Sequence, residues 1–169
     1  MIASQIVYRS ATIDDAGEMI AVHYASVHSI PSGHYHDDIL AAWSPSPDEH
    51  RRKWLADLVA NDSTVCELAT AASGRVIGFG IALPEQSKLQ ALYISPEYSG
   101  LGIGARLLFA VEARCKDFGA DSLELNASYN AVNFYCSKGY ASIRETTQPL
   151  TDGLEMGAVF MSKCLAKAV

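Results

Sequence analysis

The stretch from Leu89 to Leu108, which reads LQALYISPEYSGLGIGARLL, decides how the rest of the chain is organised. Its first part, Leu89 to Ile94, is short, apolar and rich in β-branched and aromatic residues, which predicts a strand. Pro96 and a glycine-rich turn follow, and apolar residues at helical spacing begin near Ile103. Glycines leave backbone N–H groups open at the positive end of that helix, so the stretch predicts a phosphate-binding loop.

Composition limits the class of protein. The 169 residues fit one domain, residues 1–169, with a substantial core. A net charge of -6 and a pI near 5.3 argue against a general affinity for nucleic acid or anionic membranes. The N-terminus, Met1 to Tyr8, carries no basic leader, and no stretch approaches the roughly 20 apolar residues of a membrane span. We therefore expect a cytoplasmic protein with no nucleic-acid or membrane partner.

Metal and disulfide sites are not indicated by the sequence. The segment HYHDD, residues 34–38, gathers two imidazoles and two carboxylates that could bind a metal or take a proton from an amine. It lacks a third, remote ligand, and Asp37 and Asp38 also suit a helix start, so we expect no metal. No C-x-x-C pair occurs, and we interpret the cysteines as reduced thiols. They are Cys66, Cys115, Cys136 and Cys164.

Hydrophobic periodicity predicts the remaining elements. The helix expected over residues 47–61 should turn Trp54 inward and expose the basic run 51–53, and the helix at 103–118 should bury Phe118. His23 lies on the apolar stripe of the first helix, as a half-buried core histidine often does. Hairpins and helical crossovers alternate, which predicts an α+β (α/β three-layer) fold with the Leu89–Ile94 strand at its centre. Strands are expected over 6–9, 64–71, 75–83, 122–126, 140–146 and 155–163, and further helices from Thr12, over 37–43 and over 131–138.

Two other phosphate-binding motifs compete for the glycine loop. Gly100 to Ala105 fits G-x-G-x-x-G/A, and Glu124 lies near the spacing expected of a ribose-binding acid. A dinucleotide fold, however, needs the glycines directly after the strand and repeated βαβ units. Here residues 95–99 intervene and only one such unit exists. The Walker motif is excluded, because the loop lacks Gly-Lys-Ser/Thr.

The loop instead resembles the acetyl-CoA motif of the GCN5-related N-acetyltransferase (GNAT) superfamily. Ile94, Pro96, Gly102 and Gly104 occupy the positions of that motif, whereas Ser99 stands where the family usually has Gln or Arg, so we expect weaker cofactor affinity. Residues 126–140, NASYNAVNFYCSKGY, are similar to the family's distal motif. The resemblance implies a mixed, mostly antiparallel central sheet of about seven strands, flanked by helices and splayed at the strand of residues 89–94.

The same resemblance implies roles for individual residues. Tyr135 corresponds to the tyrosine that protonates the departing CoA thiolate. Glu124 is the expected base for the amine, with Glu85, His34 and His36 as reserves. Asn130 is expected to bind the cofactor, although helix capping would equally explain it. The remaining expected cofactor contacts are Leu92, Tyr93, Ile94, Ser99, Gly100, Leu101, Gly102, Ile103, Gly104 and Ala105.

The sequence therefore predicts an acetyl-CoA-dependent N-acetyltransferase that acts on a primary amine of a small molecule or peptide, by direct attack in a ternary complex. The alternatives are a non-catalytic acyl-CoA-binding regulator and a dinucleotide-dependent oxidoreductase. Retention of Tyr135 favours the enzyme over the regulator. The segments 30–47 and 147–154 are expected to form the acceptor pocket, and a homodimer is compatible with the sequence.

Overall fold

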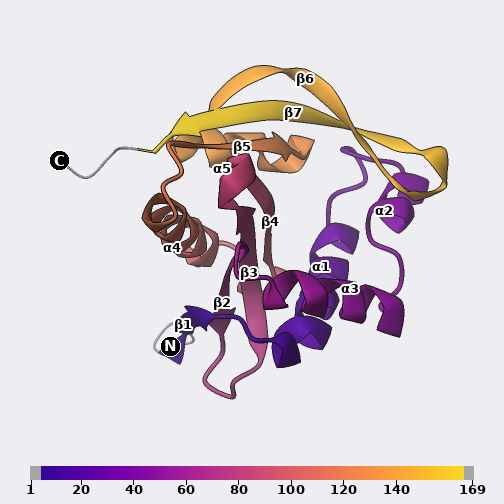
Figure 1. The fold of residues 1–169 in the computed structure, drawn as a ribbon. Helices are drawn as coiled ribbons and strands as arrows, with labels where there is room; N and C mark the ends of the chain where they lie inside the picture. Colours follow the sequence, from indigo (N-terminus) through magenta and orange to yellow (C-terminus); the bar gives the residue numbers. More distant parts are fainter. Residues whose placement is uncertain (1–4, 166–169) are drawn as a thin grey trace.

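The structure, a computed structural model, describes residues 5–165 (Figure 1). Residues 1–4 and 166–169 lie outside the described part of the chain. The expectation that residues 1–8 carry no basic leader rests partly on residues 1–4, so the structure does not bear on it. The helices and strands agree with the predicted ones to within a few residues. They are β1 (Val7–Ser10), α1 (Ala16–His28), α2 (Asp37–Trp43), α3 (Glu49–Ala60), β2 (Val65–Thr70), β3 (Val76–Leu83), β4 (Lys88–Ile94), α4 (Ile103–Asp117), β5 (Ser122–Ala127), α5 (Val132–Ser137), β6 (Ala141–Pro149) and β7 (Glu155–Cys164).

One seven-stranded sheet organises these elements, in the order β1-β2-β3-β4-β5-β7-β6. Every neighbouring pair is antiparallel except β4 and β5, which are parallel. Helix α4 covers one face of the β2–β4 part, and α1 and α3 cover the other (Figure 1). The predicted mixed, mostly antiparallel α+β fold is confirmed.

Two glycines of β3 allow α4 to pack closely on the sheet. A Cβ at Gly78 would lie 2.7 Å from Cδ1 of Ile94, and one at Gly80 would lie 2.9 Å from Cγ2 of Val111. Both distances are shorter than real Cβ contacts, so a larger residue at either position would require the Ile94 or Val111 side chain to shift. The missing side chains thus make room for neighbouring side chains within the core.

Strand β4 carries a bulge close to the point where it parts from β5. Ala82 pairs with Leu89 and Ile81 pairs with Ala91, so Gln90 is an extra residue in the ladder. A bulge bends its strand and increases the local twist. The register of β4 with β5 contains a single pair, Lys88 opposite Glu124.

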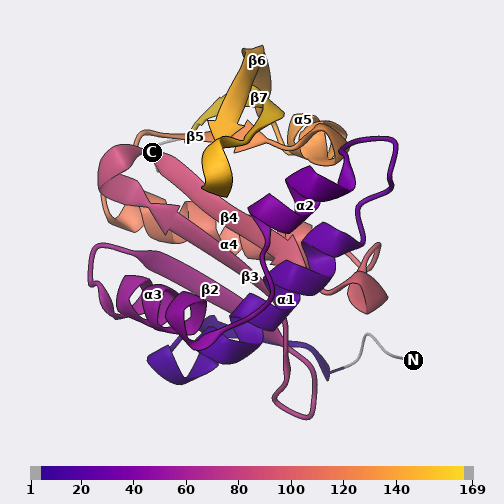
Figure 2. The ribbon, with the colours of Figure 1, turned by 90° about the vertical axis from the view of Figure 1, so that its right-hand side faces the viewer.

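Beyond that pair, within the described residues, the remaining part of β4 has no strand partner on its β5 side. Figure 2 shows β4 beside β3, with β5, β6 and β7 turned away from it. The predicted splaying of the strand at residues 89–94 is confirmed. The bulge at Gln90 lies where the two strands part, and the sequence pattern does not reveal it.

Two predictions of burial are wrong. Trp54 is 56% exposed, whereas the next residue, Leu55, is 3% exposed and packs in the core, so the buried face of α3 does not include Trp54. Phe118 is 45% exposed, because α4 ends at Asp117 and the next residue no longer faces the core. The predicted solvent-exposed basic run is also wrong at Arg51, which lies at a cavity between α3 and the sheet.

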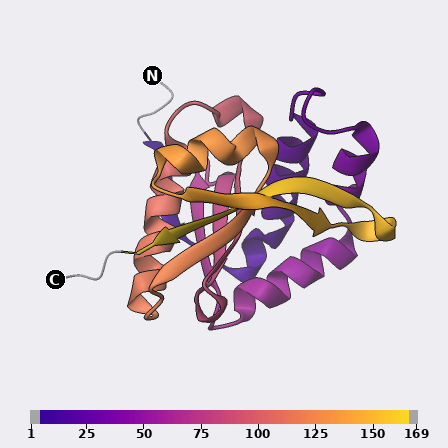
Figure 3. The same ribbon diagram turned by 90° about the horizontal axis from the view of Figure 1, so that it is seen from above.

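The hairpin of β6 and β7 extends past the sheet towards α2 (Figure 3). At its turn, the hydroxyl of Thr151 donates a hydrogen bond to the carbonyl of Ala42 at 3.2 Å. β6 runs to Pro149, three residues further than predicted, and this extension brings residues 148–151 over the cavity. Within residues 5–165 no helix has the length and apolar character needed to cross a membrane.

Candidate functional site

The turn between β4 and α4 presents open backbone donors. Gly100 and Gly102 have φ of +76° and +78°, a left-handed conformation that favours glycine, and a Cβ at either would meet nothing within 4 Å. The first intrahelical bond runs from the Arg106 N–H to the Gly102 carbonyl at 3.2 Å. The N–H groups of residues 103–105 therefore have no acceptor within the helix. These amides, the helix dipole and the absence of side chains suit an anionic ligand such as a phosphate.

Ser99 stabilises this turn by a local bond. Its hydroxyl donates to the Pro96 carbonyl at 2.7 Å, which closes the short 3-10 turn η4 (Pro96–Tyr98). The side chain thus supports the loop conformation.

The free edge of β4 directs two amides towards β5. The Ser95 N–H donates to the Ile77 carbonyl of β3 at 2.8 Å. Because alternate residues of a strand direct their N–H groups to opposite edges, the N–H of Tyr93 also faces β3, whereas those of Leu92 and Ile94 face the gap. The structure thus places a backbone donor at Leu92 where β4 and β5 diverge.

Tyr135 is buried in α5, with only 7% of its surface exposed. Its ring packs edge-on between those of Phe134 and Tyr140, at centroid distances of 5.2 and 5.5 Å. No group within residues 5–165 forms a hydrogen bond with its hydroxyl. Burial, and to a smaller extent the Tyr93 phenol, raises the pKa of Tyr135 well above its usual range, so the phenol keeps its proton at neutral pH.

A charged network behind α5 supports Tyr135. The hydroxyl of Tyr140 donates to the buried carboxylate of Glu112 at 3.0 Å, and the Lys163 ammonium donates to the same carboxylate at 3.0 Å. Burial and Glu112 raise the pKa of Tyr140 above its usual range. These bonds hold the Tyr140 ring against Tyr135.

Asn130 does not cap a helix. It lies within the 3-10 turn η5 (Tyr129–Ala131), whose N-cap is Ser128, and α5 begins after Ala131. The alternative that capping explains Asn130 is wrong. Its side chain is exposed and makes no hydrogen bond with any residue of the described chain.

Glu124 lies at the narrow end of the gap between β4 and β5. It is exposed, stands opposite Lys88, and shares a strand face with Asn126. Asn126 donates to the Gln148 side chain at 2.9 Å and lines the cavity, whereas Glu124 does not. A proton path from the cavity to Glu124 would therefore need a bridging water.

The reserve bases lie away from the cavity. His34 and His36 are exposed on the loop before α2 and do not line the cavity. Glu85 lies in the 3-10 turn η3 (Pro84–Gln86), where its carboxylate is 3.4 Å from the Ser63 hydroxyl. Within residues 5–165 no group of three His, Cys, Asp or Glu side chains is placed to hold a metal ion.

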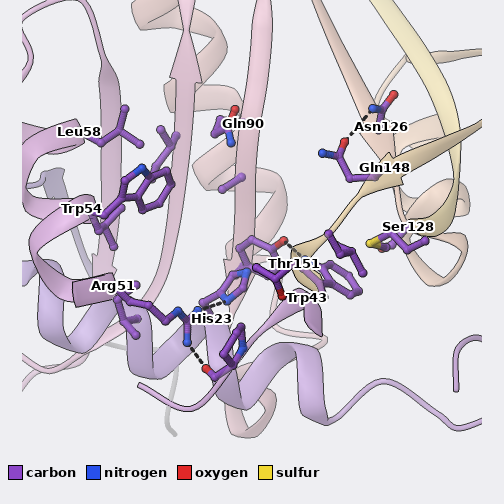
Figure 4. Close-up of a pocket in the computed structure, with 18 of the residues that line it drawn as sticks. His23, Trp43, Arg51, Trp54, Leu58, Gln90, Asn126, Ser128, Gln148 and Thr151 are labelled. Atoms are coloured by element: carbon purple, nitrogen blue, oxygen red, sulfur yellow. Dashed lines mark hydrogen bonds between the residues drawn. The ribbon is translucent and has the colours of Figure 1, made fainter. Parts of the chain in front are cut away.

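A cavity of about 410 Å³ lies against β3 and β4 and reaches the part of β5 that diverges from them (Figure 4). Residues 42, 43, 45 and 148–151 contribute to it, so both segments expected to form the acceptor pocket do line a cavity. Its walls are mainly aliphatic, with a minority of aromatic side chains. The aromatic lining residues are Trp43, Trp54, Phe79 and Tyr93.

The cavity brings together His23 and Arg51. The sequence predicts His23 in the core and Arg51 on the solvent-exposed face of its helix. An Arg51 N–H donates to Nδ1 of His23 at 3.1 Å, and Nδ1 lies 2.7 Å from the Ser44 hydroxyl. Burial first, and then Arg51 and His28, lowers the pKa of His23 to about 4. Since a guanidinium only donates, Nδ1 accepts, and the neutral ring carries its hydrogen on Nε2.

Tyr93 lines the cavity and contacts two other residues that line it. Its hydroxyl accepts a hydrogen bond from the Trp43 indole at 3.2 Å, and its ring meets that of His23 edge-on at 4.4 Å. Burial raises the pKa of Tyr93 to about 12, so this phenol is also neutral. The spacing of His23 and Trp43 in the sequence gave no signal of this contact, because it depends on the packing of α1 and α2 on β4.

Known proteins resemble the chain in sequence and in fold. Residues 46–156 match the family described as "Acetyltransferase (GNAT) domain". No curated protein matches the sequence significantly. A GCN5-related N-acetyltransferase from Rhodopseudomonas palustris, also described as "Aminotransferase, Class-II", is 27% identical, with a TM-score of 0.83 over 98% of this chain and 99% of its own.

Two further solved structures share the fold. The PaiA N-acetyltransferase from Thermoplasma acidophilum, in complex with coenzyme A, is 24% identical, with a TM-score of 0.74 over 95% of this chain and 99% of its own. A phosphinothricin acetyltransferase from Sinorhizobium meliloti, in complex with AcCoA, is 18% identical, with a TM-score of 0.71 over 95% of this chain and 89% of its own.

Proposed function

Because the chain belongs to the GCN5-related N-acetyltransferase superfamily and is an acetyltransferase, we propose that it transfers an acetyl group from acetyl-CoA to a primary amine. The acceptor attacks directly, with both substrates bound to one domain. The observation that carries the proposal is the gap between β4 and β5, which adjoins both the open amides of the α4 loop and the cavity. One site can thus hold an anionic cofactor and an acceptor side by side.

The residues present fit the cofactor. The amides of Ile103, Gly104 and Ala105 suit a pyrophosphate, and the open space at Gly100 and Gly102 lets an anion approach the backbone. Ser99 and Leu101 complete the loop, and Asn130 offers from η5 a side-chain amide that has no hydrogen-bond partner within residues 5–165. Complexes of related folds with coenzyme A and AcCoA support this assignment.

The edge of β4 supplies the polarising group. Acetyl-CoA brings the activated acetyl group as a thioester. The Leu92 N–H, which faces the gap, donates to the acetyl oxygen as negative charge grows on it during attack, and Ile94 binds the pantetheine arm further along the edge. The side chain of Tyr93, on the same strand, lines the cavity that receives the acceptor amine.

Tyr135 serves as the general acid. Its ring is buried, its hydroxyl is accessible and has no hydrogen-bond partner among the described residues, and it keeps its proton because its pKa is raised. When the thiolate departs, this phenol is the nearby group that can supply a proton. The raised pKa also returns the proton to Tyr135 once the products leave.

Glu124 serves as the base that removes a proton from the acceptor amine. Since it lies outside the cavity, it acts through a water at the narrow end of the gap, beside Asn126. His23 is unsuited to this task, because Nδ1 already accepts from Arg51 and the pKa of about 4 makes the ring a weak base.

Ligand-dependent thermal unfolding tests the proposal. Acetyl-CoA at 100 times its dissociation constant should stabilise the protein by about 2.7 kcal/mol, and NAD should give no shift. Release of CoA thiol should then follow addition of a suitable primary amine. Stabilisation by NAD alone would instead support the oxidoreductase, and acetyl-CoA binding without thiol release across an amine panel would support the regulator.

A further inference from the structure

The side chains that line the cavity beside β4 include two cationic ones and, within residues 5–165, no acidic one. Of the described residues that line it, Arg51 and Lys88 are cationic, His23 is neutral, and none is Asp or Glu. Neither cation has a carboxylate within ion-pair distance in the described part of the chain. The space that would receive the acceptor is therefore electropositive, although the whole protein carries a net charge of -6.

Arg51 is held in place by uncharged acceptors. Its guanidinium donates to the Pro45 carbonyl, to Nδ1 of His23 at 3.1 Å and to the Ser44 hydroxyl at 3.3 Å. A guanidinium has five N–H donors, so two have no acceptor among residues 5–165. Figure 4 shows the Arg51 side chain running along the cavity wall to His23.

The electrostatic setting of Arg51 leaves its charge available. Burial lowers the pKa of Arg51, and Asp48 is the acidic group that opposes this effect. The Asp48 carboxylate, however, accepts the backbone N–H of Arg51 at 2.8 Å as the cap of α3. The guanidinium is thus fixed and partly desolvated, with no carboxylate bound to it.

We infer that the acceptor is a small amine that carries a carboxylate beside an apolar body, and that Arg51 binds this carboxylate. The inference rests on the proposed acetyl transfer and specifies its substrate class. A planar guanidinium is the side chain best suited to a carboxylate, and the bond is strongest where water is excluded.

The size and the walls of the cavity fit the rest of such a molecule. A volume of about 410 Å³ is within the range of sites for small molecules. Leu55, Leu58, Phe79 and the two tryptophans provide apolar contacts. Apolar and aromatic α-amino acids have this combination of groups, whereas a polyamine would bring only positive charge into a positive cavity.

Matched acceptors test the inference by steady-state kinetics of thiol release. Leucine, leucinamide and 3-methylbutylamine share the apolar body, and only leucine has the carboxylate. The amide also controls for the effect of an α-carbonyl on the amine. A hydrogen bond to a charged group contributes about 1.5–3 kcal/mol, so leucine should exceed leucinamide in kcat/KM by about 10-fold to 150-fold.

A pair of variants on adjacent residues tests the role of Arg51. Arg51→Gln should reduce the preference for leucine over leucinamide to within about threefold of unity. Arg52→Gln is the matched control, because it removes the same charge from α3. Arg52 is paired with Glu49 and does not line the cavity, so this variant should keep the full preference.

Tryptophan fluorescence of the wild-type protein provides a second measurement that does not depend on a variant or on turnover. Both tryptophans of the chain line the cavity, so titration in the presence of CoA reports on occupancy. Leucine should bind at least about tenfold more tightly than leucinamide.

Equal use or equal binding of leucine and leucinamide by the wild type, or a preference that survives in Arg51→Gln, would overturn the inference. Rapid acetylation of spermidine but not of leucine would also overturn it, while the proposed acetyl transfer would stand. Failure of the protein to bind acetyl-CoA would instead remove the proposed function itself.

Discussion

The hydroxyl of Tyr35 accepts a hydrogen bond from the backbone N–H of Tyr129 at 2.9 Å, and the two rings stack with a centroid distance of 5.4 Å. The same hydroxyl donates to the Gly157 carbonyl at 2.6 Å. A loop that precedes α2 is thereby attached to the turn that leads into α5 and to β7. The acceptor side of the site and the segment that carries Tyr135 are therefore linked by one side chain.

Removal of that hydroxyl should destabilise the protein. Tyr35→Phe keeps the ring stack but leaves the Tyr129 N–H and the Gly157 carbonyl without their partner, at a cost of about 1–3 kcal/mol. Urea unfolding measures the difference. Tyr24→Phe is the control, because the Tyr24 hydroxyl makes no hydrogen bond within the described residues, and its effect should stay within about 0.5 kcal/mol. Equal effects of the two variants would show that the bridge contributes nothing.

Loss of the Tyr135 hydroxyl should slow the reaction and leave cofactor binding intact. Tyr135→Phe removes the proposed proton donor, and general acid catalysis contributes about 100-fold or more to a rate. We expect kcat to fall by about that factor, with acetyl-CoA affinity, measured by calorimetry, changed less than about twofold. A kcat equal to that of the wild type would remove Tyr135 from the mechanism.

Glu124→Gln tests the proposed base. The change keeps the size and polarity of an exposed side chain, so stability should not change by more than about 0.5 kcal/mol. If a water passes the amine proton to Glu124, kcat should fall by about 100-fold. Glu145→Gln on β6 is the control, since it removes the same charge from an exposed strand residue. Equal turnover of the two variants would show that Glu124 is not the base.

Alanine substitutions at two glycines with the same backbone conformation distinguish an effect of backbone strain on stability from an effect on acetyl-CoA binding. Gly102 and Gly74 have φ of +78° and +88°, and a Cβ at either would meet nothing within 4 Å. Alanine at each should therefore lower stability by a similar amount, about 1–2 kcal/mol. Only Gly102→Ala should also weaken acetyl-CoA binding in calorimetry, because its methyl group adjoins the open amides of α4. Equal affinities for both variants would exclude the loop from the cofactor site.

His23 should make the protein less stable in mild acid. In the folded protein its pKa is about 4, below its ordinary value of 6.5. Between these values the unfolded chain binds the proton and the folded chain does not, so stability falls as pH decreases from about 6.5 to about 4, by up to about 3 kcal/mol. Urea unfolding at several pH values measures the slope. His23→Gln should remove this part of the pH dependence, and an unchanged slope would contradict the assignment.

Most of the fold could be predicted from the sequence, because periodic apolar residues and glycine turns act locally. The strand, loop and helix of residues 89–108 lie where their pattern predicts them. The bulge at Gln90 could not be predicted, since it depends on the register of β4 against β3. The burial of Trp54 and Phe118 was predicted wrongly, because helical spacing identifies an apolar stripe but not which residues at its edge or at the end of the helix remain exposed.

The parts of the site that local backbone conformation determines could be predicted from the sequence. The parts that depend on contacts between distant residues could not. The open loop at Gly102 follows from the glycine pattern. By contrast, Arg51 reaches His23 across 28 residues, and Tyr35 reaches Tyr129 across 94. The basic run 51–53 and the histidines at 34 and 36 drew attention to these segments, but the sequence did not show that Arg51 would reach His23 or that Tyr35 would reach Tyr129.

The single pair between β4 and β5 also bears on how the two parts of the sheet unfold. One half of the sheet, β1 to β4, and the other, β5 to β7, share only the contact of Lys88 with Glu124 as a ladder. Amides of β5, β7 and β6 should therefore exchange with solvent in a unit distinct from those of β2 and β3. A ligand that lies in the gap would contact both units. The two units should then unfold together in the complex, and separately in the free protein.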